Sequence, residues 1–323
     1  MYILQFKPIL KNLLWGGEKI IPYKQIKSDL HQVGESWEIS GVKDDESIVA
    51  NGEYEGLTLS ELISKHGSEL VGKLNYARFG NEFPLLIKFI DARQDLSIQV
   101  HPNDDLAKMR HNSKGKTEMW YVVEADNGAK LRSGFSCAIS PQQYEEEVKN
   151  NNITNVLKEY KINSGDVFFL PAGRIHSIGA GSFIAEIQQT SNITYRIYDF
   201  NRCDANGQCR ELHIDLSKDA IDYRIESDYR THYDMALEKE IKLVSCPYFT
   251  TSLYDLSQPT TLDYSEMDSF VVVMCVEGKG DIVDKNDNII SIHQGETILV
   301  PACMDILRIS PSPRMKILTS YIL

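Results

Sequence analysis

The chain has 323 residues, of which 42% are apolar and 25% charged, and its formal net charge is −12. This composition is typical of a soluble globular protein with a large core. The acidic excess argues against a nucleic-acid partner, because phosphate backbones require a concentrated basic face. A small anionic ligand is still compatible with it, since two or three well-placed cations are enough to bind one.

Three features of the sequence indicate where in the cell the protein is found: its hydropathy, its N-terminal residues and its cysteines. The longest wholly apolar run covers residues 270–276, far short of the ~20 needed to cross a bilayer, so we expect no membrane contact. The first residues lack the features of a secretory signal, which predicts a cytoplasmic location. The six cysteines include no Cys-x-x-Cys pair. We expect free thiols, with Cys246, Cys275 and Cys303 packed as small hydrophobic residues.

The predicted elements are mostly short strands. Residues 1 to about 50 alternate apolar runs with turns, as strands do. One helix is expected over residues 57–73, because Thr58 and Glu61 have the spacing of a capping box before an apolar stripe. An apolar strand follows, whose single charge, Lys88, either has a function or is simply paired. Shorter helices are expected after residues 103 and 140 and, behind a loop, within residues 208–223.

The functional prediction depends on residues 96–102. In an extended strand Ser97, Gln99 and His101 point to one face, while the apolar residues between them point to the other. The apolar face suits a core. The polar face must therefore meet solvent, a pocket or a metal.

Glu118 and His176, which lie in two later segments, are candidate partners of Gln99 and His101. Two imidazoles, a carboxylate and an amide oxygen form a ligand set for Zn²⁺ that leaves a position for water or substrate. Two histidines and a carboxylate also describe non-haem Fe(II) sites, so these residues do not choose the metal. The alternative is structural: a buried histidine before a turn-forming proline and a histidine that caps a strand.

An internal repeat predicts two related all-β domains. Residues 165–172 (GDVFFLPA) recur in modified form as residues 295–302 (GETILVPA). His176 follows the first copy at the position where Ile306 follows the second. The second copy lacks this ligand, which favours a metal site in the first domain and a structural role for the second.

In this order the segments resemble the metal site of cupins and, more narrowly, type I mannose-6-phosphate isomerases in their short bacterial form. The resemblance rests on Q-x-H-P at 99–102, K-x-E at 116–118 and the second histidine, and it extends from L-W-G-G at 14–17 to C-P-Y-F at 246–249. It implies a mainly β fold of two cupin-like jelly-roll barrels with a few short helices. The implied domains are a catalytic metal-binding domain over 1–210, a helical linker over 211–240 and a C-terminal domain without metal ligands over 241–323.

The resemblance also implies a zinc-dependent interconversion of mannose 6-phosphate and fructose 6-phosphate through a cis-enediol. One Zn²⁺ per chain would be held by Gln99, His101, Glu118 and His176. The implied catalytic residues are Arg196, Lys116 and Glu186, and the implied substrate-binding residues are Ser97, Lys116 and Arg196. Whether Glu186, Lys116 or a zinc-held water is the base stays open, as do the oligomeric state and the strictness of sugar specificity.

Three other functions fit parts of the pattern. A non-catalytic sugar-binding cupin would be expected to lose metal ligands, which the first domain keeps. An Fe-dependent cupin oxygenase would use the same two histidines and carboxylate, but it would not need Lys116 and Arg196 together. A cupin-type glucose-6-phosphate isomerase would differ only in the C2 epimer that it accepts. Without the resemblance, a salt bridge between Arg196 and Asp199 would be the simpler expectation.

Overall fold

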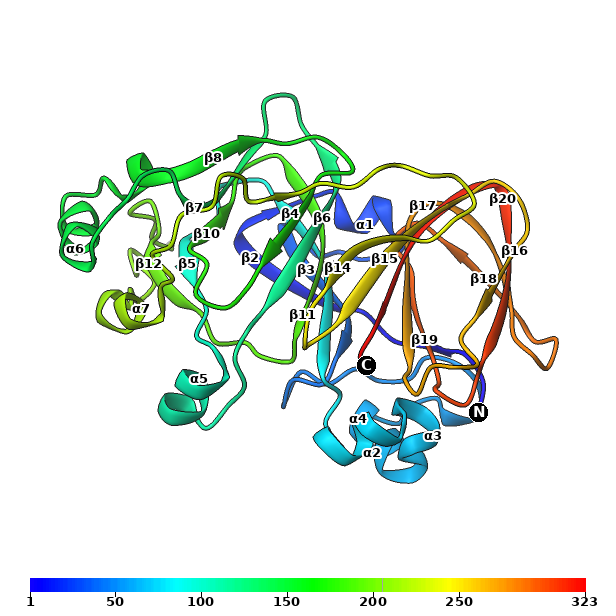
Figure 1. Cartoon of the computed structure of the whole chain (residues 1–323). Helices are drawn as coiled ribbons and strands as arrows, with labels where there is room; N and C mark the ends of the chain where they lie inside the picture. The colour runs from blue at the N-terminus through cyan, green and yellow to red at the C-terminus, as the bar shows by residue number, and fades with distance from the viewer. Residues whose placement is uncertain (205) are drawn as a thin grey trace.

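The computed structural model describes residues 1–204 and 206–323. Its strands form two β units that lie side by side, one from the larger N-terminal part of the chain and one from the C-terminal part (Figure 1). Short helices lie around the edges of both units. The prediction of a mainly β fold is confirmed. No helix in the described ranges has the length and apolar character that crossing a membrane requires.

The N-terminal unit contains two antiparallel sheets. The first has the strand order β13 (Arg230–Thr231), β9 (Val167–Leu170), β6 (Glu118–Ala125), β11 (Ser182–Gln189), β4 (Leu85–Ala92), β2 (Ile9–Gly17) and β3 (Val33–Ser40). The second has the order β12 (Tyr195–Tyr198), β5 (Ile98–Val100), β10 (His176–Ile178), β7 (Lys130–Phe135) and β8 (Leu157–Lys161). Apolar residues of both sheets, including Trp120 and Ile178, fill the space between them.

The C-terminal unit is a single antiparallel sheet that curls around its own core, which includes Val273, Ile298 and Ile309. Its order is β1 (Leu4–Gln5), β19 (Thr297–Val300), β17 (Val271–Val283), β20 (Ile306–Tyr321), β15 (Thr250–Leu256) and β14 (Ile241–Ser245), with β16 (Thr260–Asp263) on β20 and β18 (Ile289–His293) on β17.

The two units share a strand order. The series β9, β6, β11, β4 in the N-terminal unit corresponds to β19, β17, β20, β15 in the C-terminal unit. The repeated sequences at 165–172 and 295–302 lead into the corresponding strands β9 and β19. Each unit has an edge strand that comes from outside its main stretch of sequence. The N-terminal strand β1 pairs with β19 of the C-terminal unit, and β13, which lies just before that unit in sequence, pairs with β9 of the N-terminal unit. Domain boundaries near residues 210 and 240 stay a prediction.

The larger sheet of the N-terminal unit is covered on both faces, so every residue of β4 is buried. Ile87 and Phe89 belong to the core cluster that also contains Phe270 of the C-terminal unit. Because side chains alternate along a strand, Lys88 and Ile90 point the other way, toward the space between the two N-terminal sheets. Packing between the units therefore determines which face of β4 points toward the space between the two N-terminal sheets.

The helices follow their local signals with one correction. They are α1 (Ile20–Tyr23), α2 (Leu59–His66), α3 (Ser68–Val71), α4 (Lys73–Phe79), α5 (Asp104–His111), α6 (Pro141–Lys149) and α7 (Ile214–Ala220), with 3-10 turns at Gly52–Tyr54 and Ile153–Val156. The capping box of Thr58 and Glu61 is confirmed. The single helix expected over 57–73 is wrong, because Gly67 has a φ of +50° and ends α2 before α3 begins.

The cysteine prediction is only partly right. Cys203 and Cys209 form a disulfide, because an antiparallel bridge within their loop brings the two Cα atoms to 4.0 Å. Cys275 is buried, as expected, and Cys246 is half-buried. Cys303 is exposed, because it follows β19 in a surface turn and does not pack into the core.

Candidate active site

The candidate site lies between the two sheets of the N-terminal unit, where β5 is the central strand. Gln99 is the middle residue of β5, and its cross-strand neighbours are His176 on β10 and Arg196 on β12. Ser97 and His101 flank it on the same face. Glu118, the first residue of β6, enters from the facing sheet. Short-range alternation and sheet pairing together bring the four predicted metal ligands, Gln99, His101, Glu118 and His176, close to one another.

Two glycines shape the turns around these residues. A Cβ on Gly115 would lie 2.6 Å from the backbone of Asn103, so only glycine lets the turn before Lys116 pack this closely. Gly173 has a φ of +89° and donates its N–H to the carbonyl of His101 at 2.9 Å. This bond ties the turn before His176 to the end of β5.

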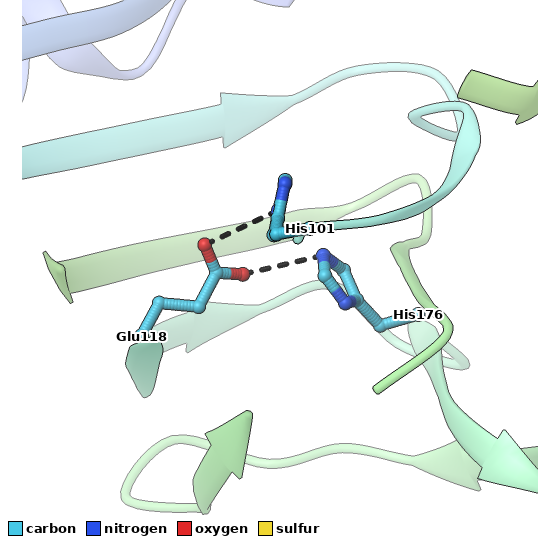
Figure 2. Close-up of side chains that lie close together, drawn as sticks. All are labelled: His101, Glu118 and His176. Atoms are coloured by element: carbon cyan, nitrogen blue, oxygen red, sulfur yellow. Dashed lines mark ion pairs between the residues drawn. The ribbon is translucent and has the colours of Figure 1, made fainter. Parts of the chain in front are cut away.

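His101, Glu118 and His176 form a buried cluster whose candidate ligand atoms all lie within 4.8 Å of one another. The Nε2 atom of His101 lies 3.5 Å from Glu118 Oε2, and that of His176 lies 3.3 Å from Glu118 Oε1 (Figure 2). The Nδ1 atoms face the carbonyls of Ile193 and Arg174 at 2.9 and 2.8 Å. These carbonyls accept the Nδ1 protons, which leaves both Nε2 lone pairs toward the carboxylate.

The surroundings of this cluster fit a divalent cation. The side chain of Glu118 is fully buried, and its Oε1 has no hydrogen-bond donor among the described residues, while Oε2 faces the ammonium group of Lys116. Burial, together with the charge of Glu186, raises the pKa of Glu118 to about 7. Burial also lowers the pKa of His176 to about 3 and that of His101 well below its usual value, so both rings are neutral and able to bind metal.

Gln99 and Lys116 connect the cluster to the neighbouring cavity. Gln99 Nε2 lies 3.3 Å from His176 Nε2, and a half-turn of the amide would present its oxygen to the same point. Lys116 Nζ forms an ion pair with Glu118 Oε2 at 2.7 Å and lies 3.3 Å from His101 Nε2. Both side chains also line the cavity, so the cluster borders it.

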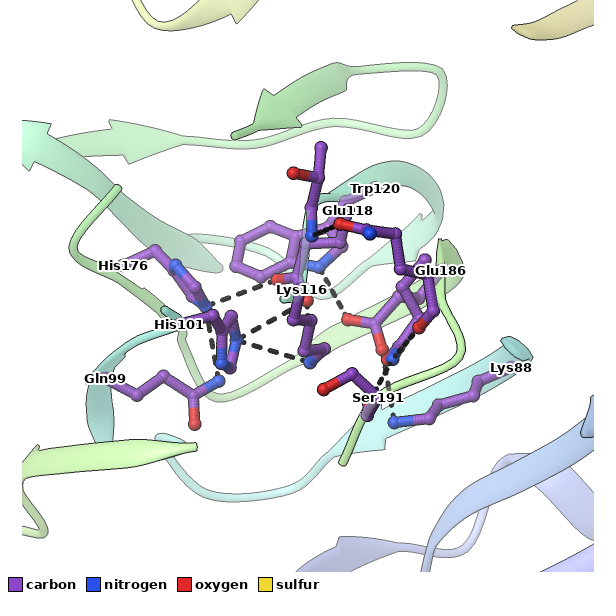
Figure 3. A network of polar contacts seen from close by, with 12 residues as sticks. Lys88, Gln99, His101, Lys116, Glu118, Trp120, His176, Glu186 and Ser191 are labelled. Atoms are coloured by element: carbon purple, nitrogen blue, oxygen red, sulfur yellow. Dashed lines mark hydrogen bonds and ion pairs between the residues drawn. The ribbon is translucent and has the colours of Figure 1, made fainter. Parts of the chain in front are cut away.

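A second buried network lies beside the cluster (Figure 3). Lys88 Nζ is 3.3 Å from Glu186 Oε1 and 3.5 Å from Glu35 Oε2. Trp120 donates its indole N–H to Glu186 Oε2 at 2.8 Å. Burial opposes ionisation of Glu186, but Lys116 and Lys88 lower its pKa below the usual value. Glu186 is therefore a carboxylate at neutral pH, held in place by two neighbours.

Sequence reasoning did not assign Lys88, Glu35 or Trp120 to the site. Lys88 carried a signal, because it is the single charge in the apolar run of residues 83–90. Trp120 follows Glu118 by two residues on β6, and that spacing places both side chains on one face of the strand. In the structure Lys88 forms an ion pair with Glu186, and its side chain also lines the cavity beside the cluster.

The cavity beside the cluster has a volume of about 150 Å³ and brings together most of the predicted residues. Its lining includes Ser97, Gln99, Lys116, Glu186 and Arg196, together with Trp15, Glu35, Lys88 and Arg210. A larger cavity of about 640 Å³ lies around Tyr2 and Ile290 and contains no member of the cluster.

Arg196 lies at the open side of this cavity. Its Nη1 donates to the carbonyl of Glu211 at 3.0 Å, and its Nε is buried without a partner among the described residues. The salt bridge with Asp199 that the sequence allowed is not formed. Asp199 instead accepts hydrogen bonds from Arg202 and Arg210, both of which lie in the loop that follows β12.

Fold and site first define a class: a mainly β protein with a cupin domain, whose buried His101, Glu118 and His176 could hold a metal ion. Residues 3–164 match the family model described as phosphomannose isomerase type I, catalytic domain. Residues 239–322 match the model described as mannose-6-phosphate isomerase, cupin domain. The chain belongs to the type I phosphomannose isomerases, in their short bacterial form.

Individual relatives agree with the family models along nearly the whole chain. Mannose-6-phosphate isomerase ManA of Bacillus subtilis is 34% identical over 92% of this chain and 92% of its own length. Mannose-6-phosphate isomerase of Streptococcus mutans is 33% identical over 89% of each. The crystal structure of mannose 6-phosphate isomerase from B. subtilis superimposes with a TM-score of 0.90 at 28% identity, covering 100% of both chains.

Proposed function

We propose that this chain is a zinc-dependent aldose–ketose isomerase that interconverts mannose 6-phosphate and fructose 6-phosphate through a cis-enediol. The observation that carries the proposal is the buried cluster of His101, Glu118 and His176 at the border of a cavity that also contains Lys116 and Glu186. Membership of the phosphomannose isomerase family supports the choice of substrate. A cytoplasmic location is part of the same proposal.

The reaction removes a proton from C2 of the open-chain sugar and returns it to C1. Its barrier comes from the weak acidity of that C–H bond and from negative charge that develops on the adjacent oxygens. One zinc ion per chain, held by Gln99, His101, Glu118 and His176, would supply positive charge beside those oxygens.

The residues of the chain supply the other requirements. Glu186 is held ionised by Lys88 and oriented by Trp120, which suits a group that accepts and returns a proton. Lys116 offers an ammonium proton or a fixed cation at the border of the cavity. Glu118, Lys88, Lys116 and Glu186 are all buried, and burial strengthens the electrostatic interactions between them.

Two further residues suit substrate binding. Ser97 lies on the same strand face as Gln99 and lines the cavity, where its hydroxyl can hydrogen-bond a sugar hydroxyl. Arg196 lies at the open side with an unpartnered Nε, which suits the phosphate or an enediolate oxygen. We propose that both residues bind the substrate and that Arg196 also contributes to catalysis.

Conversion of mannose 6-phosphate to fructose 6-phosphate by the purified zinc-loaded protein tests the proposal. Wild type should convert it. The activity of His101→Ala should fall by more than the roughly 100-fold loss that follows removal of a hydrogen-bond partner of a metal ligand. His31→Ala is the matched control, because that side chain is 83% exposed and outside the cluster. Glucose 6-phosphate tested in parallel reports the strictness of epimer specificity.

An inactive wild-type protein that still binds metal would overturn the substrate assignment. Iron dependence with oxygen uptake would then indicate the oxygenase alternative, and sugar binding without turnover would indicate a sugar-binding cupin. The retained His101, Glu118 and His176 together with Lys116 and Arg196 favour the isomerase over both.

A further inference from the structure

Arg196 and Arg210 occupy the junction between two cavities. The inner one, of about 150 Å³, borders the metal cluster. The outer one has a volume of about 630 Å³ and opens beside the loop that contains Cys209. Both arginines line both cavities. A ligand whose reacting end lies in the inner cavity would therefore pass its other end between these two side chains.

Arg210 is held in position from two sides. Asp199, whose side chain is 5% exposed, accepts hydrogen bonds from Arg210 Nε at 2.8 Å and Nη2 at 2.6 Å, and from Arg202 Nη2 at 2.7 Å. Arg202 directly precedes Cys203, and Arg210 directly follows Cys209; the disulfide joins these two cysteines. The cross-link keeps the two arginines side by side around one carboxylate.

Positive charge is in excess at this junction. Deeper in the site the lysines have acidic partners: Lys116 pairs with Glu118, and Lys88 pairs with Glu186 and Glu35. At the junction, by contrast, Arg210 shares the buried carboxylate of Asp199 with Arg202, and Arg196 has no acidic side chain within ion-pair distance among the described residues.

Two acids, Asp204 and Glu211, border the outer cavity. Asp204 accepts backbone N–H groups of its own loop, and the Glu211 side chain is 84% exposed. Burial and the charge of Arg210 lower the pKa of Arg196, which indicates that the two guanidinium groups act on each other across the opening. An anion between them would relieve this repulsion.

We propose that Arg210, positioned by Asp199 and the Cys203–Cys209 cross-link, binds the phosphoryl group of the substrate jointly with Arg196. The inference rests on the proposed function and adds a specificity residue from a loop outside the metal-site motifs. A phosphomonoester dianion accepts hydrogen bonds from two guanidinium groups at once, and this arrangement distinguishes a sugar phosphate from the free sugar.

Steady-state kinetics of the zinc-loaded protein test the role of Arg210. Arg210→Gln should raise KM for mannose 6-phosphate by about 10- to 100-fold and leave kcat nearly unchanged, because a charged contact to a non-reacting group is lost. Arg210→Lys should recover part of this loss. Arg224→Gln is the matched control, since Arg224 forms a similar arginine–carboxylate contact with Asp222 on an exposed loop.

Inorganic phosphate as a competitive inhibitor separates anion recognition from sugar recognition. Its inhibition constant should rise in Arg210→Gln by a factor similar to that of KM. An unchanged KM and inhibition constant would overturn the proposal, and so would a fall in kcat at constant KM. If wild type converts no sugar phosphate, the proposed function has failed. Calorimetric phosphate binding to wild type and Arg210→Gln then decides the role of Arg210, with equal affinities counting against it.

The cross-link is tested with dithiothreitol, a dithiol that gives two electrons and two protons to the disulfide and itself becomes a cyclic disulfide. Reduction should raise KM severalfold in wild type, because Arg210 loses a covalent constraint. The Cys203→Ser/Cys209→Ser variant should show the raised KM already and no response to dithiothreitol. A double variant with wild-type KM would show that the cross-link does not position Arg210.

Discussion

Replacement of Glu118 by glutamine should abolish the stabilisation of the protein by zinc. The side chain is fully buried and is the only carboxylate in the described cluster, so glutamine keeps its size but removes the charge that a cation needs. At a free zinc concentration of about 100 times its Kd, binding adds about 2.7 kcal/mol to the free energy of unfolding of wild type. For a chain of 323 residues this corresponds to a rise in Tm of about 4 °C.

Thermal unfolding with a chelator and with excess zinc measures this difference without reference to activity. Wild type should melt higher with zinc, whereas Glu118→Gln should melt at the same temperature in both conditions. Glu124→Gln is a suitable control, because Glu124 lies on the same strand β6 but is exposed. It should keep the wild-type shift. A Glu118→Gln protein with the full zinc shift would refute the assignment of the metal site.

Two further substitutions test a buried ion pair that faces the C-terminal unit and a buried hydrogen bond of the site. Lys24→Met should destabilise the protein by about 3 to 5 kcal/mol in urea unfolding, because it leaves the buried carboxyl group of Glu38 without its partner; Lys24→Met/Glu38→Met should recover much of the loss. Trp120→Phe should lower kcat/KM for mannose 6-phosphate by about tenfold with zinc content unchanged, because Glu186 loses a buried donor. Wild-type stability in the first case, or wild-type kinetics in the second, would contradict these assignments.

The sequence predicted those features of the site that depend on short-range rules. Strand alternation alone placed Ser97, Gln99 and His101 on one face. In the structure Gln99 lies in β5, and Ser97 and His101 lie directly before and after this strand. The capping boxes at Thr58 and Ser140 depend on residues three positions apart, so both could be recognised locally.

The features that the sequence did not predict depend on distant packing. The side of β4 that carries Lys88 faces the cavity because the opposite side packs against the C-terminal unit, and no local pattern specifies that choice. The pairing of β1 with β19 places a strand from the N-terminus in the sheet of the C-terminal unit. The Cys203–Cys209 bond depends on the path of the loop rather than on a recognisable spacing, and the same loop brings Arg210 to Asp199 in place of Arg196.

Zinc titration of the metal-free protein, followed by the rate of conversion of mannose 6-phosphate to fructose 6-phosphate, tests the central claim most directly. We expect no activity without metal and a linear return of activity that ends at one zinc ion per chain. Full activity in the metal-free protein would contradict the account. Recovery with iron alone, accompanied by oxygen uptake, would contradict it as well.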